Sequence, residues 1–231
     1  MKAHNSLARF LHRLPVFKEL DLISCERLLQ QSNVLSYAGR QVVQDSGQTH
    51  HHLYIVVTGQ LQMVANSENG GEMTVAIFGP GSMSSWVALY HDTPAMRSVV
   101  AQADTRLIAI PAEVMRQLLV ENPYLYPLVL NLEAKRFRSA LNWQQLVLNP
   151  DRTRRIAALL LMLLGISGDE SEHPTLQLTH AQLLVSAQCS RQMLHVSLKT
   201  LQSRGLIRQS YGAIHILNKA GLQEFAAVVE S

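Results

Sequence analysis

Short hydrophobic runs separated by turn residues fill the chain from Asn33 to Pro111. The runs are rich in β-branched residues, and glycine-containing turn signals such as TG at 58–59 and NGG at 69–71 interrupt them. A spacing of roughly 8–12 residues between turns predicts an antiparallel sandwich or barrel. Glycine tolerates the positive φ of tight turns, so the NGG sequence predicts a hairpin between its flanking strands.

Helical periodicity characterises the chain on either side of this region. The first 30 residues carry helically spaced apolar positions, with a break at Pro15. After Pro111 a long helical pattern runs from Tyr124 to Leu148, and Asn149-Pro150 ends it. This pattern has two apolar faces, one formed by Leu130, Ala134, Phe137, Leu141 and Leu148 and the other by Leu125, Val129, Leu132, Trp143 and Leu146.

An ordinary surface helix buries a single apolar stripe. A helix with two stripes can cover its own β-domain with one and pair with a second copy of the chain through the other. We therefore expect a dimerisation helix, and a helix buried inside one domain is the alternative.

The residues after Asp151 predict a group of short helices and a small β-wing. Asp151 is an expected N-cap, and the polar loop GISGDESEHP follows at 165–174. Thr179 and Ser190 each precede a short amphipathic helix, and a tight turn, SAQC, separates the two. The strands LIRQ and AIHIL, joined through residues 210–212, form the wing. Two short helices joined in this way can insert the second helix into the major groove of DNA.

Charge is unevenly distributed along the chain. The net charge of +3 indicates little, but no Asp or Glu occurs from His173 to Gln223. The cations of that interval are Arg191, Lys199, Arg204, Arg208 and Lys219. A stretch with a single sign of charge is typical of a surface that faces phosphates, which favours DNA binding.

Length and composition limit the class of protein. A chain of 231 residues that is 47% hydrophobic and 16% charged suits two modest folded domains. Its longest apolar run, Ile156 to Leu164, is far below the roughly 20 residues that span a bilayer, so we expect a soluble cytoplasmic protein without a membrane partner. Cys25 and Cys189 supply neither a disulfide framework nor an iron–sulfur site, and the histidines at 50–52 fit a polar loop. We therefore expect no metal site and no cofactor.

Motifs of the common enzyme classes are missing from the sequence. It has no nucleophile elbow, no phosphate-binding glycine loop and no zinc-protease motif. Its acidic residues offer no candidate pair for general acid–base chemistry. We therefore expect that the protein is not an enzyme.

Taken in order, these segments resemble the catabolite-activator/fumarate-nitrate-reduction (CRP/FNR) regulator family from about Val16 to Ile216. The runs YAGRQVVQDSG, LYIVVTGQLQMV and GGEMTVAIFGPGS are similar to its cyclic-nucleotide-binding β-roll, and CSRQMLHVSLKTLQSRGLI to its recognition helix and wing. The resemblance implies an α+β fold with an antiparallel β-roll sensor domain at 1–123, a long dimerisation helix and hinge at 124–150, and a winged helix-turn-helix domain at 151–231. It further implies a homodimeric transcription regulator that binds a palindromic double-stranded DNA site and acts with RNA polymerase.

The resemblance also assigns residues to the DNA interface. Arg191, Gln192 and His195 would face base edges, where arginine can fork onto guanine and glutamine can pair with adenine. The family usually has an arginine where this chain has Val196, so the half-site differs from the usual one. The whole expected set, in which the two hydroxyl residues contact phosphates, is Thr179, Ser190, Arg191, Gln192, His195 and Lys199.

In relatives that bind cyclic nucleotides, a Gly-Glu pair holds the ribose and an Arg-Ser or Arg-Thr pair holds the phosphate. This chain has Arg97-Ser98, but Ser85 and Trp86 stand where Gly and Glu would be. The missing carboxylate removes a charge-assisted hydrogen bond worth on the order of 1.5–3 kcal/mol. Arg97 either binds a different anion or pairs with a nearby carboxylate or carbonyl, and Trp86 either lines a pocket or packs in a core.

These differences imply an unidentified small-molecule effector other than cyclic AMP. A cyclic-nucleotide-responsive regulator and a ligand-independent regulator with a degenerate β-roll are the alternatives. The residues expected to line the effector pocket are Ser85, Trp86, Arg97, Ser98, Phe137 and Leu141.

Overall fold

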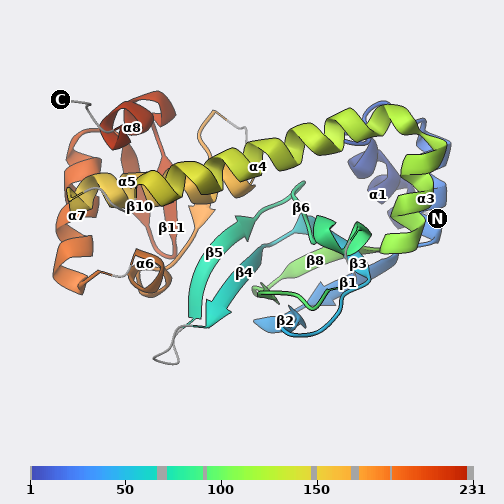
Figure 1. Ribbon diagram of the computed structural model, residues 1–231, viewed down its shortest axis with the longest axis horizontal. Helices are drawn as coiled ribbons and strands as arrows, with labels where there is room; N and C mark the ends of the chain where they lie inside the picture. The colour runs from blue at the N-terminus through green and yellow to red at the C-terminus, as the bar shows by residue number, and fades with distance from the viewer. Residues whose placement is uncertain are drawn as a thin grey trace. The chain divides into compact units, whose positions relative to one another are not determined.

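The computed structural model describes residues 2–66, 72–90, 93–146, 150–167, 172–187 and 189–227. Its contacts divide the chain into two compact units (Figure 1). The N-terminal unit comprises Met1–Gln62 and Phe78–Ala134, and the C-terminal unit comprises Met63–Ile77 and Lys135–Ser231. The boundaries expected at residues 123 and 150 stay predictions.

The β-rich region folds into two four-stranded sheets, so the predicted antiparallel fold is confirmed. The strand orders are β1-β8-β3-β6 and β2-β7-β4-β5. The pairs β1–β8, β3–β8, β3–β6 and β2–β7 are antiparallel. The NGG sequence predicted to form a hairpin turn lies outside the described residues. The strands are β1 (Asn33–Tyr37), β2 (Gln41–Gln44), β3 (His52–Thr58), β4 (Leu61–Asn66), β5 (Glu72–Phe78), β6 (Met83–Ser84), β7 (Ser98–Ala101) and β8 (Thr105–Pro111).

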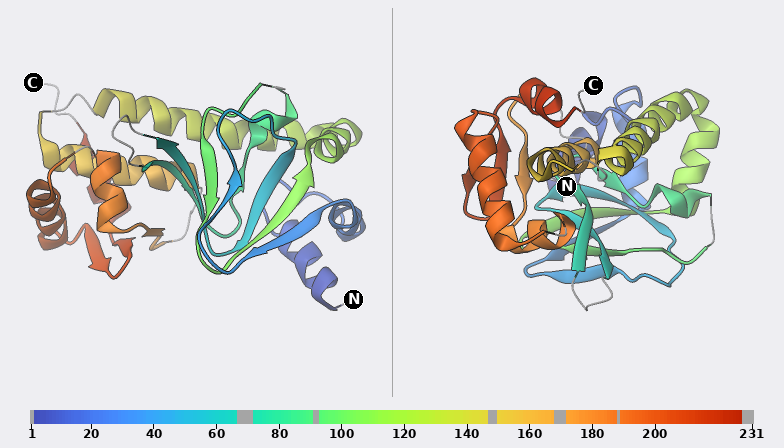
Figure 2. Two further views of the ribbon diagram at one scale, coloured as in Figure 1. Left: turned by 90° about the horizontal axis from the view of Figure 1, so that it is seen from below. Right: turned by 60° about the vertical axis from the view of Figure 1, so that its left-hand side comes forward.

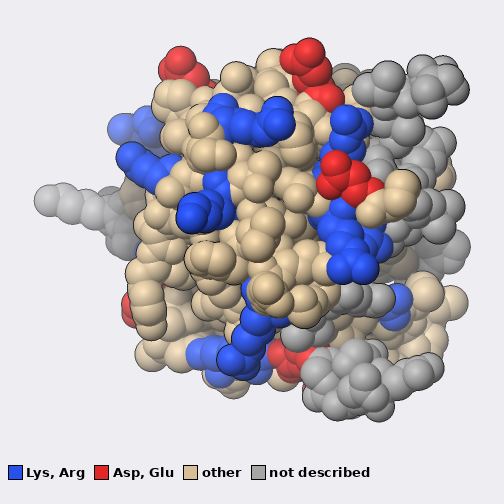
Figure 3. Space-filling view, turned by 90° about the vertical axis from the view of Figure 1, so that its left-hand side faces the viewer, with Lys and Arg blue, Asp and Glu red and all other residues tan. Residues whose placement is uncertain are grey.

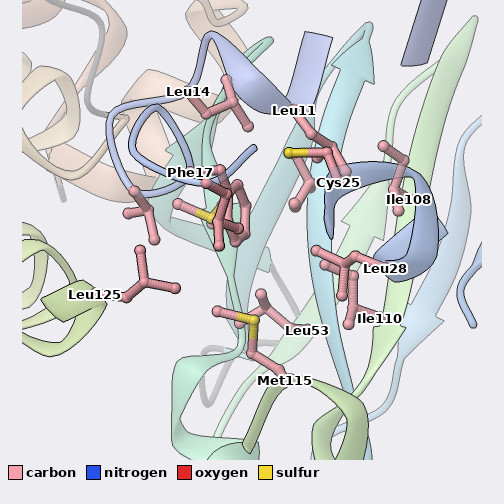
Figure 4. Packing of buried hydrophobic residues seen from close by; sticks show 14 of the residues in the cluster. Leu11, Leu14, Phe17, Cys25, Leu28, Leu53, Ile108, Ile110, Met115 and Leu125 are labelled. Carbon is pink, nitrogen blue, oxygen red and sulfur yellow. The ribbon is translucent and has the colours of Figure 1, made fainter. Parts of the chain in front are cut away.

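An apolar core joins the helices of the N-terminal unit to its strands. Figure 4 shows Phe17 among Leu53 of β3, Met115 of α3 and Leu125. Phe17 and Leu53 are completely buried, so the segment after the predicted break at Pro15 contributes to the core instead of forming a surface loop. The helical segments of this core are α1 (Lys2–His12), α2 (Leu22–Gln30), the 3-10 turn η1 (Trp86–Leu89) and α3 (Ala112–Glu121).

The long helix α4 (Tyr126–Leu146) presents both predicted faces. It starts two residues later than predicted, because Pro123–Leu125 forms a 3-10 turn. Leu125 and Val129 are buried in the N-terminal core, and Leu132 packs against it. The side chains of Trp143, Leu146 and Leu148 lie outside the described residues. The opposite face is exposed and consists of Leu130, Ala134, Phe137 and Leu141.

The C-terminal unit contains the predicted helix pair and wing (Figure 2). Its three-stranded antiparallel sheet has the order β10-β11-β9, so a strand at 175–177, which we did not predict, adds to the wing. None of the described helices is long and apolar enough to cross a membrane. The elements are α5 (Arg152–Ser167), β9 (Thr175–Gln177), α6 (His180–Ala187), α7 (Arg191–Ser203), β10 (Ile207–Ser210), β11 (Ala213–Ile216) and α8 (Lys219–Ala226).

Part of the β4–β5 segment belongs to the core of the C-terminal unit. Ile77 is buried there with the apolar residues of α5 and α7. The hydroxyl of Ser186 on α6 is buried and donates a hydrogen bond to the carbonyl of Thr74 at 2.9 Å. The C-terminal unit is therefore assembled from two separate stretches of sequence.

The turn between β3 and β4 depends on Gly59. Gly59 has a φ of +74°, and a Cβ added to it would lie 2.5 Å from Thr105 Oγ1 and 2.6 Å from Thr105 Cα. The same hydroxyl of Thr105 accepts the backbone N–H of Gln60 and donates to the Gln60 carbonyl, both at 3.0 Å. The segment around Thr105 approaches Gly59 so closely that no side chain fits at residue 59.

We expect Gly59→Ala to lower the free energy of unfolding by about 2 kcal/mol or more, because it combines a steric clash with a left-handed backbone. Urea denaturation followed by circular dichroism measures the change. Gly39→Ala is the matched control, since a Cβ at Gly39 meets nothing within 4 Å. Equal stability of the two variants would contradict the turn geometry.

Candidate nucleic-acid interface and effector pocket

Helix α7 starts at a capped N-terminus. The Ser190 hydroxyl accepts the backbone N–H of Met193 at 3.3 Å, as an N-cap serine does. Leu194, Leu198 and Leu201 are buried in the C-terminal core. Because these leucines are three or four residues apart, one stripe of the helix is buried and the opposite stripe faces solvent.

The solvent-facing stripe of α7 carries the residues predicted to contact bases. Arg191, Gln192, His195 and Lys199 are all exposed. The first turn of the helix contains no acidic residue. The side chains therefore project from one face of a capped helix, which is the arrangement that a recognition helix needs. Their individual contacts with bases stay predictions.

Thr179 caps α6 through a reciprocal arrangement with Gln182. Thr179 Oγ1 accepts the backbone N–H of Gln182 at 3.2 Å, and Gln182 Oε1 accepts the backbone N–H of Thr179 at 2.9 Å. This is a capping box. Thr179 and Ser190 are both exposed at helix N-termini, where free N–H groups and the helix dipole favour anions.

Helix α5 packs against α7 through its first turn. Asp151 Oδ1 accepts the backbone N–H of Thr153 at 2.8 Å, which confirms the predicted N-cap. Thr153 Oγ1 lies 3.2 Å from the hydroxyl of Ser197, a buried residue of α7. Arg152 Nη1 lies 3.8 Å from the sulfur of Met193, in the first turn of α7. Arg152 carries no local sequence signal for this role, because it adjoins α7 only through the fold.

Other arginines of the C-terminal unit are held by partners inside the unit. Two guanidinium groups lie over the ring of Phe225, with Arg204 Cζ 5.0 Å and Arg154 Cζ 5.9 Å from its centroid. Arg154 also donates to the Ala227 carbonyl at 2.6 Å. These contacts fasten α8 to the start of α5 and the end of α7. Figure 3 shows Lys and Arg side chains spread over one face of the molecule, with fewer Asp and Glu among them.

The wing ends in an exposed turn. Gly212 has a φ of +69°, and the Tyr211 side chain beside it is fully exposed. His215 of β11 lies 3.0 Å from Thr175 Oγ1 through Nδ1 and 2.9 Å from Ser210 Oγ through Nε2. This histidine therefore links all three strands of the sheet.

Ser85 has the backbone conformation of a glycine. Its φ of +66° lies in the left-handed region, where glycine is the usual residue. Its hydroxyl donates to Gln44 Oε1 at 2.9 Å, and the Gln44 side chain is buried. The polar group at this position is therefore engaged within the protein.

Arg97 and Ser98 both contact backbone groups of the protein. Arg97 is exposed, and its Nη1 donates to the Met96 carbonyl at 2.9 Å. The guanidinium thus pairs with a carbonyl of the protein, and its binding of a different anion stays a prediction. The Ser98 hydroxyl accepts the backbone N–H of Ser46 at 3.0 Å.

Trp86 packs in the core of the N-terminal unit, with only 5% of its surface exposed. The large apolar area of the indole gains most from burial, which accounts for its place in the core. That Trp86 also lines an effector pocket stays a prediction. Phe137 and Leu141 are exposed on α4, so their proposed pocket role stays a prediction.

The cysteines and the histidine run form no recognisable metal site. Cys25 is buried in the N-terminal core, and Cys189 is half-buried in the C-terminal unit. His50 Nε2 lies 2.8 Å from the carbonyl of Asp45. Within the described ranges, no group of three His, Cys, Asp or Glu residues could hold a metal ion.

Both parts of the chain match known protein families. Residues 34–122 match the cyclic nucleotide-binding domain, and residues 154–225 match the Crp-like helix-turn-helix domain. The chain is 29% identical over 200 residues to the cyclic AMP receptor protein of Thermus thermophilus, covering 87% of each. It is 27% identical over 205 residues to the CRP-like protein Clp of Xanthomonas campestris, covering 81% of this chain and 85% of Clp.

Solved structures show the same architecture. The catabolite activator protein of Thermus thermophilus aligns with a TM-score of 0.51 and 26% identity, covering 92% of this chain and 98% of that one. The c-di-GMP-responsive regulator CLP of Xanthomonas campestris aligns with a TM-score of 0.63 and 22% identity, covering 86% of this chain and all of that one. The α+β fold inferred from the sequence is therefore confirmed.

Thiol labelling tests the two cysteine environments. Burial, together with the nearby charges of Asp21 and Glu26, raises the pKa of Cys25 to about 11. At pH 8 such a thiol is on the order of 0.1% thiolate, which is the reactive form. We expect dithiobis(nitrobenzoate) to label Cys189 in the folded protein and Cys25 only after unfolding. Fast labelling of a Cys189→Ser variant would contradict this assignment.

Proposed function

Because this chain belongs to the CRP/FNR family of transcription regulators, we propose that it binds a palindromic DNA site as a homodimer under the control of an effector other than cyclic AMP. The family is one of regulators and not of enzymes. A transcription regulator of this family would act together with RNA polymerase. Binding to DNA also fits the cytoplasmic location expected from the sequence.

The exposed polar face of α7 is the observation that carries the proposal. Arg191, Gln192, His195 and Lys199 share that face, while the leucines behind it anchor the helix. In this function Arg191 and Gln192 contact base edges bidentately, which distinguishes base pairs in the major groove. The adjacent His195 and Lys199 extend the contact along the groove.

Phosphate contacts orient the helix in the groove. Thr179 and Ser190 stand at two helix N-termini, whose first-turn N–H groups favour a phosphate. The Ser190 hydroxyl accepts the Met193 N–H and keeps its proton for a phosphate, whereas the Thr179 hydroxyl also donates to Gln182. We add Arg152 to this set, because its guanidinium lies against Met193 at the first turn of α7. A thioether is a weak acceptor, so this contact leaves the charge of Arg152 available for a phosphate.

The exposed apolar face of α4 supports the homodimer. Leu130, Phe137 and Leu141 are 65%, 65% and 43% exposed, and Ala134 lies between them. A stripe spaced in this way pairs naturally with its own copy about a two-fold axis. A two-fold dimer presents two recognition helices to half-sites about 34 Å apart, hence the palindromic site.

The choice of effector follows from the chemistry of the β-roll. The relatives include proteins named for cyclic AMP and one described as responsive to c-di-GMP. This chain lacks the ribose carboxylate, and the hydroxyls of Ser85 and Ser98 already have protein partners. These observations argue against cyclic AMP. The same internal bonds favour, as a second candidate, a regulator that needs no ligand.

Selection from a randomised duplex library, with and without cyclic AMP at fixed salt, tests the proposal. We expect one palindromic motif in both arms. Arg191→Ala should weaken specific binding roughly 10- to 100-fold and relax the preference at one position of each half-site, since a bidentate arginine contact contributes about 1–3 kcal/mol.

Arg27→Ala, which removes an exposed arginine of α2, is the control and should keep the motif. A motif that appears only with cyclic AMP would overturn the effector assignment. The lack of any motif in both arms would contradict the DNA-binding function itself.

Phe137→Glu tests the dimer interface. A carboxylate at this position would be buried without a partner in the proposed dimer, which costs several kcal/mol. We expect analytical ultracentrifugation to show a dimer for the native chain and a monomer for the variant at micromolar concentration. Asn131→Glu, on an exposed neighbouring face of α4, should remain dimeric. A dimeric Phe137→Glu variant would place the interface elsewhere.

A further inference from the structure

Helix α7, every residue of which the structure describes, turns seven exposed side chains toward solvent. One of them is apolar: Val196, with 55% of its surface exposed. A single exposed valine on an ordinary surface needs no explanation. The other six are polar and consist of Arg191, Gln192, His195, Lys199, Gln202 and Ser203.

The position of Val196 sets it apart from a valine on an ordinary surface. Gln192 precedes it by four residues and Lys199 follows it by three, so helical spacing puts all three side chains on neighbouring parts of one face. The buried face lies on the other side, at Leu194 and Leu198. A major groove that receives Gln192 and Lys199 therefore receives Val196 as well.

The chemistry of the groove determines what can lie opposite this side chain. Base edges in the major groove present hydrogen-bond donors, acceptors and one apolar group, the C5-methyl of thymine. A donor or acceptor pressed against valine would lose its water without gaining a partner, which is unfavourable. Only the thymine methyl gains from the contact, because two apolar surfaces leave water together.

We propose that Val196 selects an A·T pair in each half-site by packing against the thymine methyl group. The inference rests on the proposed DNA-binding function and names one base pair of its target. Burial of one methyl-sized group changes binding about fourfold. Val196 thereby provides specificity without a hydrogen bond.

Deoxyuridine differs from thymidine only by this methyl group, so it tests the contact directly. In the selected site, each thymine of one half-site is replaced singly by deoxyuridine, and the dissociation constant is measured at fixed salt. We expect one replacement to weaken binding by the native protein about fourfold. Val196→Ala should lose a similar factor on the thymine duplex and be indifferent to deoxyuridine at that position.

Val120→Ala is the matched control, since Val120 is an exposed helical valine of α3. It should respond to deoxyuridine as the native protein does. The proposal is overturned if every deoxyuridine replacement that weakens binding by the native protein also weakens binding by Val196→Ala to the same degree. It is also overturned if Val196→Ala binds the thymine duplex and the deoxyuridine duplex more weakly than the native protein does, by the same factor. That result would indicate a contact with the sugar. Failure of the native protein to select any site overturns the proposed function instead.

Discussion

The C-terminal unit depends on the way α7 is held on α5. Leucines of α7 pack into the apolar core, and within this packing the buried hydroxyl of Ser197 meets Thr153 of α5. A buried hydroxyl is costly to leave without a partner, so rotation of α7 about its axis would break this pair and also expose leucines. The two constraints together fix which side chains face outward. A helix that discriminates base pairs requires this rigidity, because its contacts are short and directional.

The β-roll, by contrast, directs its polar groups toward itself. Ser85 bonds to Gln44, Ser98 to the backbone of Ser46, and Arg97 to the carbonyl of Met96. A ligand that used the Ser85 hydroxyl as a donor would have to replace an existing hydrogen bond rather than water, so its net gain would be small.

Much of the fold could be predicted from local sequence signals. Strands between glycine turns, the caps at Asp151, Thr179 and Ser190, and the two faces of α4 each depend on residues close together in the chain. Long-range contacts could not be predicted in this way. The burial of Trp86, the three-residue strand β9, and the approach of Arg152 to Met193 depend on partners distant in sequence. The exposed face of the recognition helix was predictable because helical spacing alone determines it.

The hydrogen bond from Ser186 to Thr74 has a consequence for modularity. Winged helix-turn-helix modules are often treated as units that can be excised or exchanged between proteins. In this chain a fragment beginning at residue 135 would lack Thr74 and Ile77, leaving a buried hydroxyl without its acceptor and a gap in the core. The functional module is therefore discontinuous in sequence. Recombination that kept the DNA-facing surface of the C-terminal unit but replaced the β4–β5 segment would have to fill that gap again. The β4–β5 segment and the C-terminal helices are therefore expected to evolve together.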